Sequence, residues 1–515
     1  MVNFSIADVI RSQAKASPDS PALTYAGETQ TFAQIDVRSS RLANALRSSG
    51  VRAGDRVAIL SKNCPEFFEL VFACAKIGAI SVGLNWRLAA PEITAIVADA
   101  SPTVVIYGAG EAALFDAEAR AFESIRRTVT LGDVYTAWRD SANDLDPQYP
   151  SAPDDVVMLL YTSGTTGLPK GVMLTNLSLS FGPVISGTMW RVSQASVNLV
   201  AMPLFHIGGI GYGMSAFLHG GHTILLREVE STPILAAIER HGVTHAFFVP
   251  AVINMLVNSP GVSDTDFSTL ELLVYGASPI GEALLRRAIE VFNCDFTQAY
   301  GMTETSGTVV GLPPADHHVE GPKAALLRAC GRAFPWVQWR LVDPDGMRDV
   351  EVGQVGEIWL KTPQNTPGYW NKPQESAANI TPEGWLRTGD AAFCDENGYL
   401  FLFDRFKDMI VSGAENIYPA EVENVLANHP AVREVAVIGV PHARWGETPK
   451  ALVVLRSEMP LSEAALIDFA RRSLARYKCP SSIEFVETLP RNAAGKLLKK
   501  DLRKPYWEGH ARAVN

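Results

Sequence analysis

Apolar and polar positions alternate along the first half of the chain in segments of two lengths. Short, β-branched apolar runs at 56–60, 80–84 and 103–107 predict buried strands, and the longer segments 65–77 and 91–98 between them predict helices. Strands that alternate with helices of this length are typical of parallel sheets covered on both faces. The first half of the chain is therefore predicted to be α/β.

The same reasoning assigns elements to most of the remaining chain. Residues 110–155 lack a clear period and are expected to be irregular. Beyond Gly331 short strands and turns predominate, and the final segment mixes helices and strands as a small α+β unit. Further predicted strands are 22–25, 156–160, 270–275, 337–343, 356–361, 400–403, 435–440, 451–455 and 483–486; further predicted helices are 6–16, 282–292, 420–428 and 463–475.

Length and charge narrow the class of protein. With 515 residues the chain is too long for one compact core, so two or more domains are expected. The hydrophobic content of 47% and the charged content of 19% are typical of globular proteins. The net charge of −10, from 45 basic and 55 acidic residues, argues against a nucleic-acid partner.

Cysteine spacing and hydropathy indicate the cellular compartment of the protein. The six cysteines are scattered without Cys-x-x-Cys pairs, which argues against a zinc site or a disulfide framework. Residues 1–10 lack the basic start and apolar core of a signal peptide. The nearly uncharged run 197–226 contains Pro203 and many glycines, so it predicts strand, loop and helix rather than a membrane span. A cytoplasmic protein without an integral membrane segment is expected.

The segment 161–171 carries the most distinctive candidate chemistry. It reads Tyr-Thr-Ser-Gly-Thr-Thr-Gly-Leu-Pro-Lys-Gly and follows the predicted strand 156–160. Its glycines let backbone amides turn toward one point, its hydroxyls add donors and Lys170 adds a mobile cation, so it predicts a phosphate-binding loop. The ordinary P-loop differs, because it requires Gly at Pro169 and Ser or Thr at Gly171. A solvated turn is the alternative, and the specific order of residue types argues against it.

Three later segments add candidate chemistry. Residues 300–304 read Tyr-Gly-Met-Thr-Glu, residues 385–390 read Trp-Leu-Arg-Thr-Gly-Asp, and residues 490–496 read Pro-Arg-Asn-Ala-Ala-Gly-Lys. In open α/β sheets ligands bind beyond the carboxyl ends of the strands, so the turns at 276–279 and 301–307 are expected to share one crevice with the predicted phosphate-binding loop. Glu304 offers the hard oxygen ligand that Mg²⁺ prefers.

On these four segments the chain resembles the adenylate-forming superfamily, which contains acyl- and aryl-CoA synthetases, adenylation domains of peptide synthetases, and luciferases. The resemblance covers nearly the whole chain. It implies a large α/β domain with parallel sheets and a β-rich subdomain over 1–405, and a small mobile α+β domain over 406–515. It further implies a hinge at Lys407, and ATP, Mg²⁺ and CoA as ligands.

The resemblance also assigns roles to individual residues. Lys496, Glu304, Thr303 and His206 are implied to be catalytic, with Glu304 as the metal ligand. The residues implied to bind ATP or AMP are Thr162, Ser163, Gly164, Thr165, Thr166, Gly167, Lys170, Gly276, Ala277, Ser278, Ala299, Tyr300, Gly301, Thr303, Asp390, Arg405 and Lys496. The residues implied to contact CoA are Arg87, Gly413, Ala414, Trp445 and Lys478. Ala414 departs from the glycine usual in the family, which weakens the assignment of its loop to CoA.

Single members of this set have a simpler interpretation when taken alone. An isolated arginine such as Arg87 is most often in a surface ion pair, and a lone histidine in an apolar run, such as His206, is most often a core residue. Asp390 could cap a turn, and Lys496 could be one of several solvated lysines near the end of the chain. The motifs taken together favour the functional interpretation.

The run after His206 predicts the character of the acid. Four glycines between residues 208 and 213 leave volume unfilled, and neither Arg nor Lys stands among them. The family's amino-acid-activating members place an aspartate near this point, and this chain has none. These features predict an apolar pocket for a fatty or ring-bearing acid rather than a dicarboxylate. The residues expected to line it are His206, Ile207, Gly208, Tyr212 and Phe248.

The reaction implied by the resemblance is the conversion of a carboxylic acid, ATP and CoA into acyl-CoA, AMP and pyrophosphate through an acyl-adenylate. The main alternative is a stand-alone adenylation enzyme that loads a carrier protein. A luciferase-like oxidative enzyme and a nucleotide-binding scaffold without catalysis are also compatible with the motifs. The identity of the acid and the oligomeric state stay open, a homodimer being one option.

Overall fold

The computed structural model describes residues 4–115, 122–162, 169–343, 346–405, 408–412, 415–442, 445–456, 459, 461–491 and 497–508. At 403–405, 411, 415 and 416 it describes the backbone alone. The described strands form four sheets, of nine, six, five and four strands.

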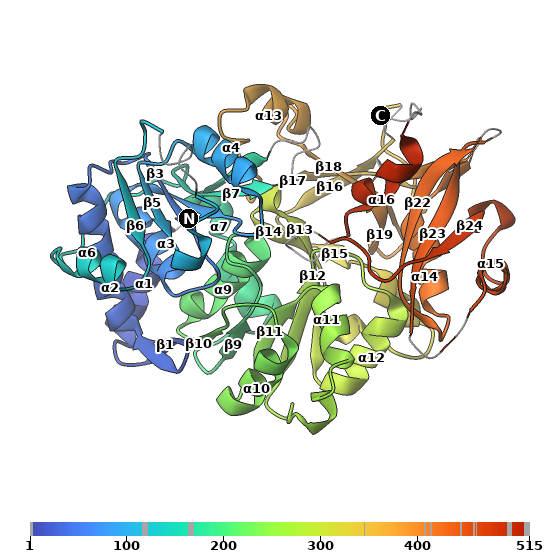
Figure 1. The fold of residues 1–515 in the computed structure, drawn as a ribbon, viewed down its shortest axis with the longest axis horizontal. Helices are drawn as coiled ribbons and strands as arrows, with labels where there is room; N and C mark the ends of the chain where they lie inside the picture. The colour runs from blue at the N-terminus through green and yellow to red at the C-terminus, as the bar shows by residue number, and fades with distance from the viewer. Residues whose placement is uncertain are drawn as a thin grey trace.

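The nine-stranded sheet forms the middle of the molecule (Figure 1). Its strand order is β15-β14-β13-β12-β11-β9-β10-β1-β2, and the strands from β13 to β1 run parallel. Antiparallel strands flank them at both edges. The bounds are β1 Pro21–Tyr25, β2 Glu28–Thr31, β9 Val197–Val200, β10 His222–Leu225, β11 His245–Phe248, β12 Leu272–Gly276, β13 Asp295–Met302, β14 Gly307–Leu312 and β15 Arg332–Ala333.

The six-stranded sheet lies beside it, with the order β6-β5-β3-β4-β7-β8. Successive residues of β3 point to opposite faces, so Val57 and Ile59 join the core shared with the nine-stranded sheet, while Ala58 and Leu60 pack on the side of helix α4. Burial on both faces explains the unbroken apolar runs of these strands. The bounds are β3 Arg56–Leu60, β4 Ile80–Leu84, β5 Val104–Tyr107, β6 Arg127–Thr130, β7 Val156–Thr162, β8 Lys170–Thr175 and α4 Ala90–Ala100.

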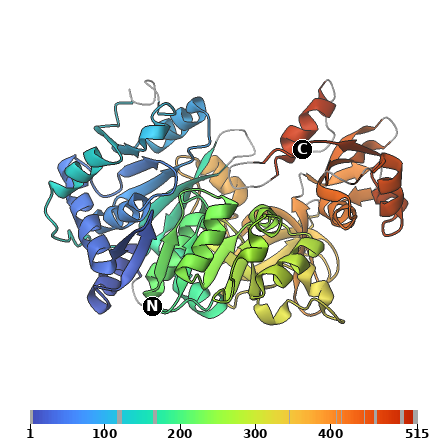
Figure 2. The same cartoon turned by 60° about the horizontal axis from the view of Figure 1, so that its bottom comes forward.

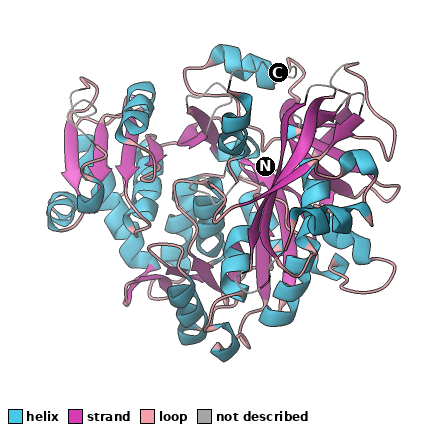
Figure 3. Ribbon diagram, turned by 45° about the vertical axis from the view of Figure 1, so that its right-hand side comes forward, coloured by secondary structure: helices cyan, strands magenta, loops and turns pink. Residues whose placement is uncertain are grey.

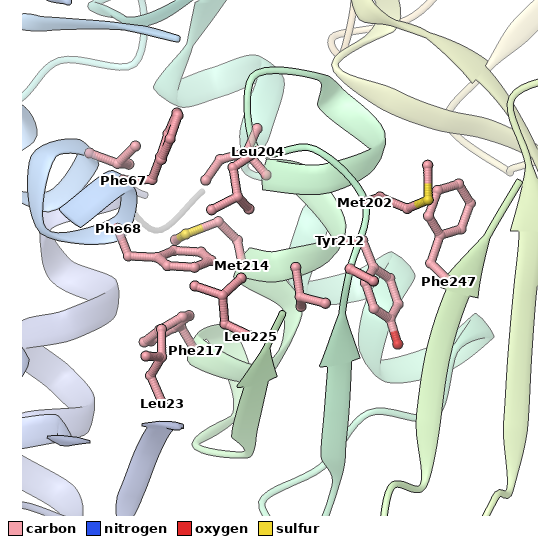
Figure 4. Close-up of a cluster of buried hydrophobic side chains, with 14 of the residues drawn as sticks. Leu23, Phe67, Phe68, Met202, Leu204, Tyr212, Met214, Phe217, Leu225 and Phe247 are labelled. Atoms are coloured by element: carbon pink, nitrogen blue, oxygen red, sulfur yellow. The ribbon is translucent and has the colours of Figure 1, made fainter. Parts of the chain in front are cut away.

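Helices fill the space between the two large sheets and cover their outer faces. Figure 4 shows part of the shared core, where Phe68 of α3 and Phe217 of α9 pack with ring centroids 4.9 Å apart. The helices of this region are α1 Ile6–Ala16, α2 Phe32–Ser48, α3 Glu66–Ile77, α6 Asp133–Asp140, α7 Asn176–Leu179, α8 Gly182–Val184, the π-helix η2 Ile185–Met189, α9 Ile207–His219, α10 Ser231–His241, α11 Pro250–Val257 and α12 Glu282–Phe292. Short 3₁₀ turns are η1 Ala109–Glu111, η3 Val262–Asp264, η4 Thr303–Thr305, η5 Pro314–Asp316 and η6 Ala324–Arg328.

Two smaller sheets complete the chain. The four-stranded sheet contains β16 Gln338–Val342, β17 Gly356–Lys361, β18 Leu386–Cys394 and β19 Leu400–Arg405, with helix α13 Pro373–Asn379 between β17 and β18. The last sheet forms a separate lobe, drawn orange to red in Figure 2. It contains β20 Ile410–Ser412, β21 Glu415–Ile417, β22 Val432–His442, β23 Gly446–Leu455 and β24 Ser482–Phe485, together with α14 Pro419–Ala427, α15 Glu463–Arg471, η8 Arg476–Lys478 and α16 Lys499–Trp507.

The predicted fold class is confirmed: helices pack around strands throughout the molecule (Figure 3), and a smaller C-terminal domain follows a large domain with parallel sheets. The division at residues 405 and 406 and the swing about Lys407 stay predictions. The prediction that 110–155 is irregular was wrong, because the segment contains β6 and α6. Helix α6 places Tyr135 and Trp138 on one buried face. None of the described helices is both long and apolar enough to cross a membrane.

Candidate functional site

The predicted phosphate loop joins two antiparallel strands. Strand β7 pairs with β8, and Thr162 lies opposite Lys170 at the open end of this hairpin. Residues 163–168, which include Ser163 to Gly167 of the predicted site, lie outside the described part of the chain. Both ends of the loop are thus tied to the edge of one sheet, where the backbone pairing fixes their separation.

Tyr369 brings Lys170 and Glu304 together. The ammonium nitrogen of Lys170 lies 5.1 Å from the centroid of the Tyr369 ring, and the Tyr369 hydroxyl donates to Oε1 of Glu304 at 3.0 Å. Only 8% of the surface of Lys170 and of Glu304 is exposed. Thr303 begins η4, which carries Glu304 into this position directly after β13. A cation over the face of one aromatic ring and a carboxylate at the hydroxyl of the same ring therefore lie beside the loop.

The described residues contain no group of three His, Cys, Asp or Glu side chains that could hold a metal ion. Glu304 could nevertheless serve as a single protein ligand, because Mg²⁺ often binds through one carboxylate together with substrate phosphates and water. The donor set at this position fits such a nucleotide-linked ion.

The carboxyl ends of β12 and β13 lie side by side, with Gly276 opposite Ala299. A Cβ atom on Gly276 would lie 2.1 Å from the carbonyl oxygen of Ala299, so only glycine allows this approach. Ala277 follows with φ of +66°, which turns the chain away from the strand before Ser278. The three residues thus form a tight turn at the end of a parallel strand, the usual place for a ligand in such sheets.

Tyr300 links this turn to the four-stranded sheet. Its hydroxyl donates to Oδ2 of Asp390 at 2.9 Å. Burial, followed by the nearby carboxylate of Asp390, raises the pKa of Tyr300 well above its ordinary value, so the phenol stays protonated and donates. The backbone of Arg405 in β19 pairs with that of Asp390 in β18. Residues predicted to bind ATP or AMP therefore come together from two different sheets.

A cavity of about 140 Å³ runs between α9 and the strand ends. At one end it is lined by Ala277, Ala299 and Gly301, and further along by Ile207, Gly208 and Tyr212. Its wall also includes Ile185, Trp190 and Phe247, and its far part includes Phe4, Ile6 and Val71. None of the described residues that line it is charged. The cavity is therefore continuous from the predicted nucleotide turns to the predicted acid pocket.

Phe247, not the expected Phe248, faces this cavity. The two are neighbours in β11 and point to opposite faces of the sheet. Phe247 packs on Tyr212 with ring centroids 5.7 Å apart, and both side chains are drawn in Figure 4. Phe248 is fully buried in the core and is not part of the cavity wall.

His206 precedes α9 but is not among the residues that line the cavity. Its Nε2 atom is buried and has no hydrogen-bond partner among the described residues. Burial, and secondarily the charge of Arg87, lowers the pKa of His206 to about 4, so the imidazole is neutral near pH 7. The Arg87 guanidinium lies over the ring of Trp86 at 4.8 Å. Arg87, predicted to contact CoA, and His206, predicted to be catalytic, are thus close enough to interact electrostatically.

The remaining predicted CoA residues lie in the C-terminal lobe. The Lys478 ammonium donates to both carboxylate oxygens of Glu421, at 2.7 and 2.8 Å. The Trp445 side chain is 44% exposed. Gly413 and Ala414, the hinge residue Lys407 and the predicted catalytic residue Lys496 lie outside the described residues.

Comparison with known proteins decides the family. Residues 10–370 match the model for AMP-binding enzymes, and residues 421–496 match the model for the AMP-binding enzyme C-terminal domain. The chain belongs to the AMP-binding enzyme family. The predicted resemblance to adenylate-forming enzymes of the acyl-CoA synthetase type is thereby confirmed.

Relatives and solved structures of this AMP-binding enzyme match over almost its full length. A fatty acid–[acyl-carrier-protein] ligase of Streptomyces coeruleorubidus is 40% identical, over 98% of this chain and 96% of the relative. A feruloyl-CoA synthase of an Amycolatopsis species is 39% identical, over 96% and 97%. The crystal structure of an anthranilate CoA ligase in complex with anthranoyl-AMP superposes with a TM-score of 0.92 at 26% identity, covering 98% of both chains.

Sequence reasoning missed three residues of the candidate site of this AMP-binding enzyme. Tyr369 sits in a loop far from every motif, and nothing in the sequence signals that it contacts Lys170 and Glu304. Trp190 follows the short π-helix η2, whose irregular turn has no recognisable period. Phe247 adjoins the predicted Phe248, and the two belong to one apolar run in which neither is distinguished.

Proposed function

We propose that this enzyme is an ATP-dependent ligase that joins an apolar carboxylic acid to CoA, with release of AMP and pyrophosphate. The observation that carries the proposal is the continuous cavity, uncharged along its described wall, which reaches from Ala277, Ala299 and Gly301 to Ile207 and Tyr212. A carboxylic acid in this cavity would present its carboxylate to a nucleotide held at the strand ends.

In the first half-reaction the carboxylate attacks the α-phosphorus of ATP, and pyrophosphate leaves. Such transfers depend on positioning and on stabilising the charge of the phosphates. Lys170 would contribute a buried positive charge beside the phosphate loop, and Lys496 would act on the α-phosphate from the C-terminal domain. Tyr300 would hold Asp390 in the orientation needed to accept hydrogen bonds from the ribose. The residues 163–167 would donate to the phosphate oxygens.

Glu304 would hold the Mg²⁺ that accompanies the nucleotide. When bound, the ion neutralises part of the phosphate charge. Tyr369 would orient the Glu304 carboxylate for binding the ion, because the Tyr369 hydroxyl donates a hydrogen bond to Oε1 of Glu304.

In the second half-reaction the CoA thiol displaces AMP from the acyl-adenylate. The neutral imidazole of His206 could accept a hydrogen bond from the incoming thiol, since its pKa of about 4 leaves it unprotonated at neutral pH. Arg87, Trp445, Lys478 and the loop with Gly413 and Ala414 would contact CoA. A swing about Lys407 would withdraw Lys496 and admit the thiol.

The second candidate is a ligase that transfers the acyl group to a carrier protein. It is favoured by one observation: the relative with 40% identity is named as a fatty acid–[acyl-carrier-protein] ligase. Since carrier proteins present a phosphopantetheine arm, the same thiol chemistry would apply. Free CoA stays the preferred acceptor because Arg87 offers an exposed cation close enough to His206 to lower its pKa. A cytoplasmic location is proposed because the thiols of all six cysteines are free.

The proposal is tested with the purified full-length chain, ATP and a panel of fatty and aromatic acids. We expect pyrophosphate release that depends on the acid, and an acyl-CoA product, identified by mass spectrometry, when CoA alone is supplied. Glu304→Gln should lower the rate by about 10²- to 10³-fold, while the exposed Glu396→Gln serves as a matched control. Adenylate formation without transfer to CoA would support the carrier-protein alternative, and absence of pyrophosphate release with every acid would refute both.

A further inference from the structure

Two polar atoms of the cavity wall have no hydrogen-bond partner among the described residues. They are Nε1 of Trp190 and the hydroxyl of Tyr212, and both atoms are buried. Tyr212 as a whole is 4% exposed. Native interiors seldom leave such groups unpaired, so a bound molecule is expected to satisfy them.

These two groups lie away from the nucleotide end of the cavity. Ile207 marks the near end, because its side chain approaches Gly307, the first residue of β14. Helix α9 rises from there by about 1.5 Å per residue, so Tyr212 lies roughly 8 Å further along its axis. In Figure 4 the hydroxyl oxygen of Tyr212 points toward the end at which the neighbouring strands begin.

Further polar groups lie near Tyr212. Ser215 lies one turn further along α9, lines the cavity, and accepts a hydrogen bond from Nδ2 of Asn198 at 2.7 Å. The Oδ1 atom of Asn198 has no partner among the described residues, and the residue is fully buried. The middle of an otherwise apolar cavity wall, between the strand ends and Phe4 and Ile6, therefore carries neutral polar groups.

The wall at this point is aromatic. Trp190 and Tyr212 have ring centroids 5.6 Å apart, and Tyr212 and Phe247 have centroids 5.7 Å apart. Such a row of rings is suited to a planar ring, which packs in offset or edge-to-face geometry. The cavity of about 140 Å³ has room for on the order of ten water-sized groups, which is enough for a ring acid.

We propose that the acid is an aromatic one that carries a neutral oxygen substituent, a hydroxyl or an ether, at the end of the ring remote from its carboxylate. Nε1 of Trp190 can only donate a hydrogen bond, so it requires an acceptor such as this oxygen. The hydroxyl of Tyr212 can donate to the oxygen or accept from it. A charged substituent is disfavoured, because no charged side chain in the described part of the chain lines the cavity to pair with it. This inference rests on the proposed ligase function and specifies its substrate class.

The test compares two acids that differ by one hydroxyl: 3-phenylpropenoic acid, with and without a para-hydroxyl group. We expect the full-length enzyme to prefer the hydroxylated acid at least tenfold in kcat/KM for acid-dependent pyrophosphate release. Trp190→Phe keeps a ring but removes the donor, and it should lower kcat/KM about tenfold for the hydroxylated acid while changing the value for the unsubstituted acid less than threefold. Tyr212→Phe removes one hydroxyl group and keeps the ring, so it is a second and smaller substitution in the same wall of the cavity.

The outcomes separate the inference from the function on which it rests. Equal rates with the two acids in the unaltered enzyme, an equal loss with both acids in Trp190→Phe and Tyr212→Phe, or a preference for a long-chain fatty acid would overturn the substrate assignment and leave the ligase function standing. Failure of every acid in the panel to release pyrophosphate would overturn the ligase function and the assignment together.

Discussion

His206 provides the sharpest test of the electrostatics of the site. Its pKa is lowered from 6.5 to about 4, chiefly because burial disfavours the imidazolium and secondarily because Arg87 carries a positive charge. Between pH 4 and 6.5 the unfolded chain therefore binds more protons at this residue than the folded chain. The neutral imidazole stabilises the fold fully above pH 6.5, and this contribution is lost as the pH falls toward 4.

The size of the effect follows from the two pKa values. They differ by about 2.5 pH units, and each unit corresponds to 1.36 kcal/mol, so the full contribution is about 3 kcal/mol. Between pH 7 and pH 5 about 2 kcal/mol of it should be lost. The His206→Asn variant, which cannot titrate, should lack this part of the pH dependence of unfolding.

The pKa itself is measured by NMR titration of histidine-labelled enzyme, with His206→Asn used to assign the resonance. We expect a midpoint near 4 in the unaltered enzyme. Arg87→Gln should raise the midpoint, since it removes the second cause of the depression. A midpoint at 6.5 or above in the unaltered enzyme would refute both the burial argument and the proximity of Arg87.

Three further predictions follow from the site and the core. Tyr300→Phe removes the donor to Asp390 and should raise KM for ATP about tenfold in pyrophosphate exchange, because hydrogen bonds to charged groups contribute about 1.5–3 kcal/mol; an unchanged KM would contradict the pairing. Lys496→Ala should abolish adenylate formation yet leave thioester formation from synthetic acyl-AMP largely intact, and equal loss of both half-reactions would count against the two-step role. Arg139→Ala leaves a buried carboxylate without its arginine partner and should lower the free energy of unfolding by about 3–5 kcal/mol. Arg471→Ala removes an exposed ion pair and should lower it by less than about 1 kcal/mol in the same urea titration.

Some strands and helices were predicted to the residue, whereas others differ by several residues, as for α15, which ends at Arg471 and not at 475. The strand at 356–361 and the helix at 282–292 have the predicted bounds, because turn residues interrupt the pattern at both ends. Helix α6 escaped prediction because it has only eight residues and two large buried side chains. Its stability comes from packing on neighbouring helices, which the sequence does not display.

Some residues of the candidate site could also be predicted from the sequence, and others could not. Motifs that follow strands were brought together, as for Tyr300 and Asp390, because the ends of packed strands meet in space. The choice between Phe247 and Phe248 could not be made, since all four residues of β11 are buried and no alternation marks the face of each. Trp190 and Tyr369 act through long-range contacts from irregular segments, for which one sequence offers no pattern.

The far wall of the cavity is supplied partly by the start of the chain, through Phe4 and Ile6. Helix α1 is fastened there by the backbone amide of Ile6, which donates to Asn176 at 3.2 Å. A truncation that removes Phe4 and Ile6 would consequently open this wall of the cavity, although neither residue belongs to the predicted catalytic groups. Substrate profiles should therefore be recorded on protein that retains both residues.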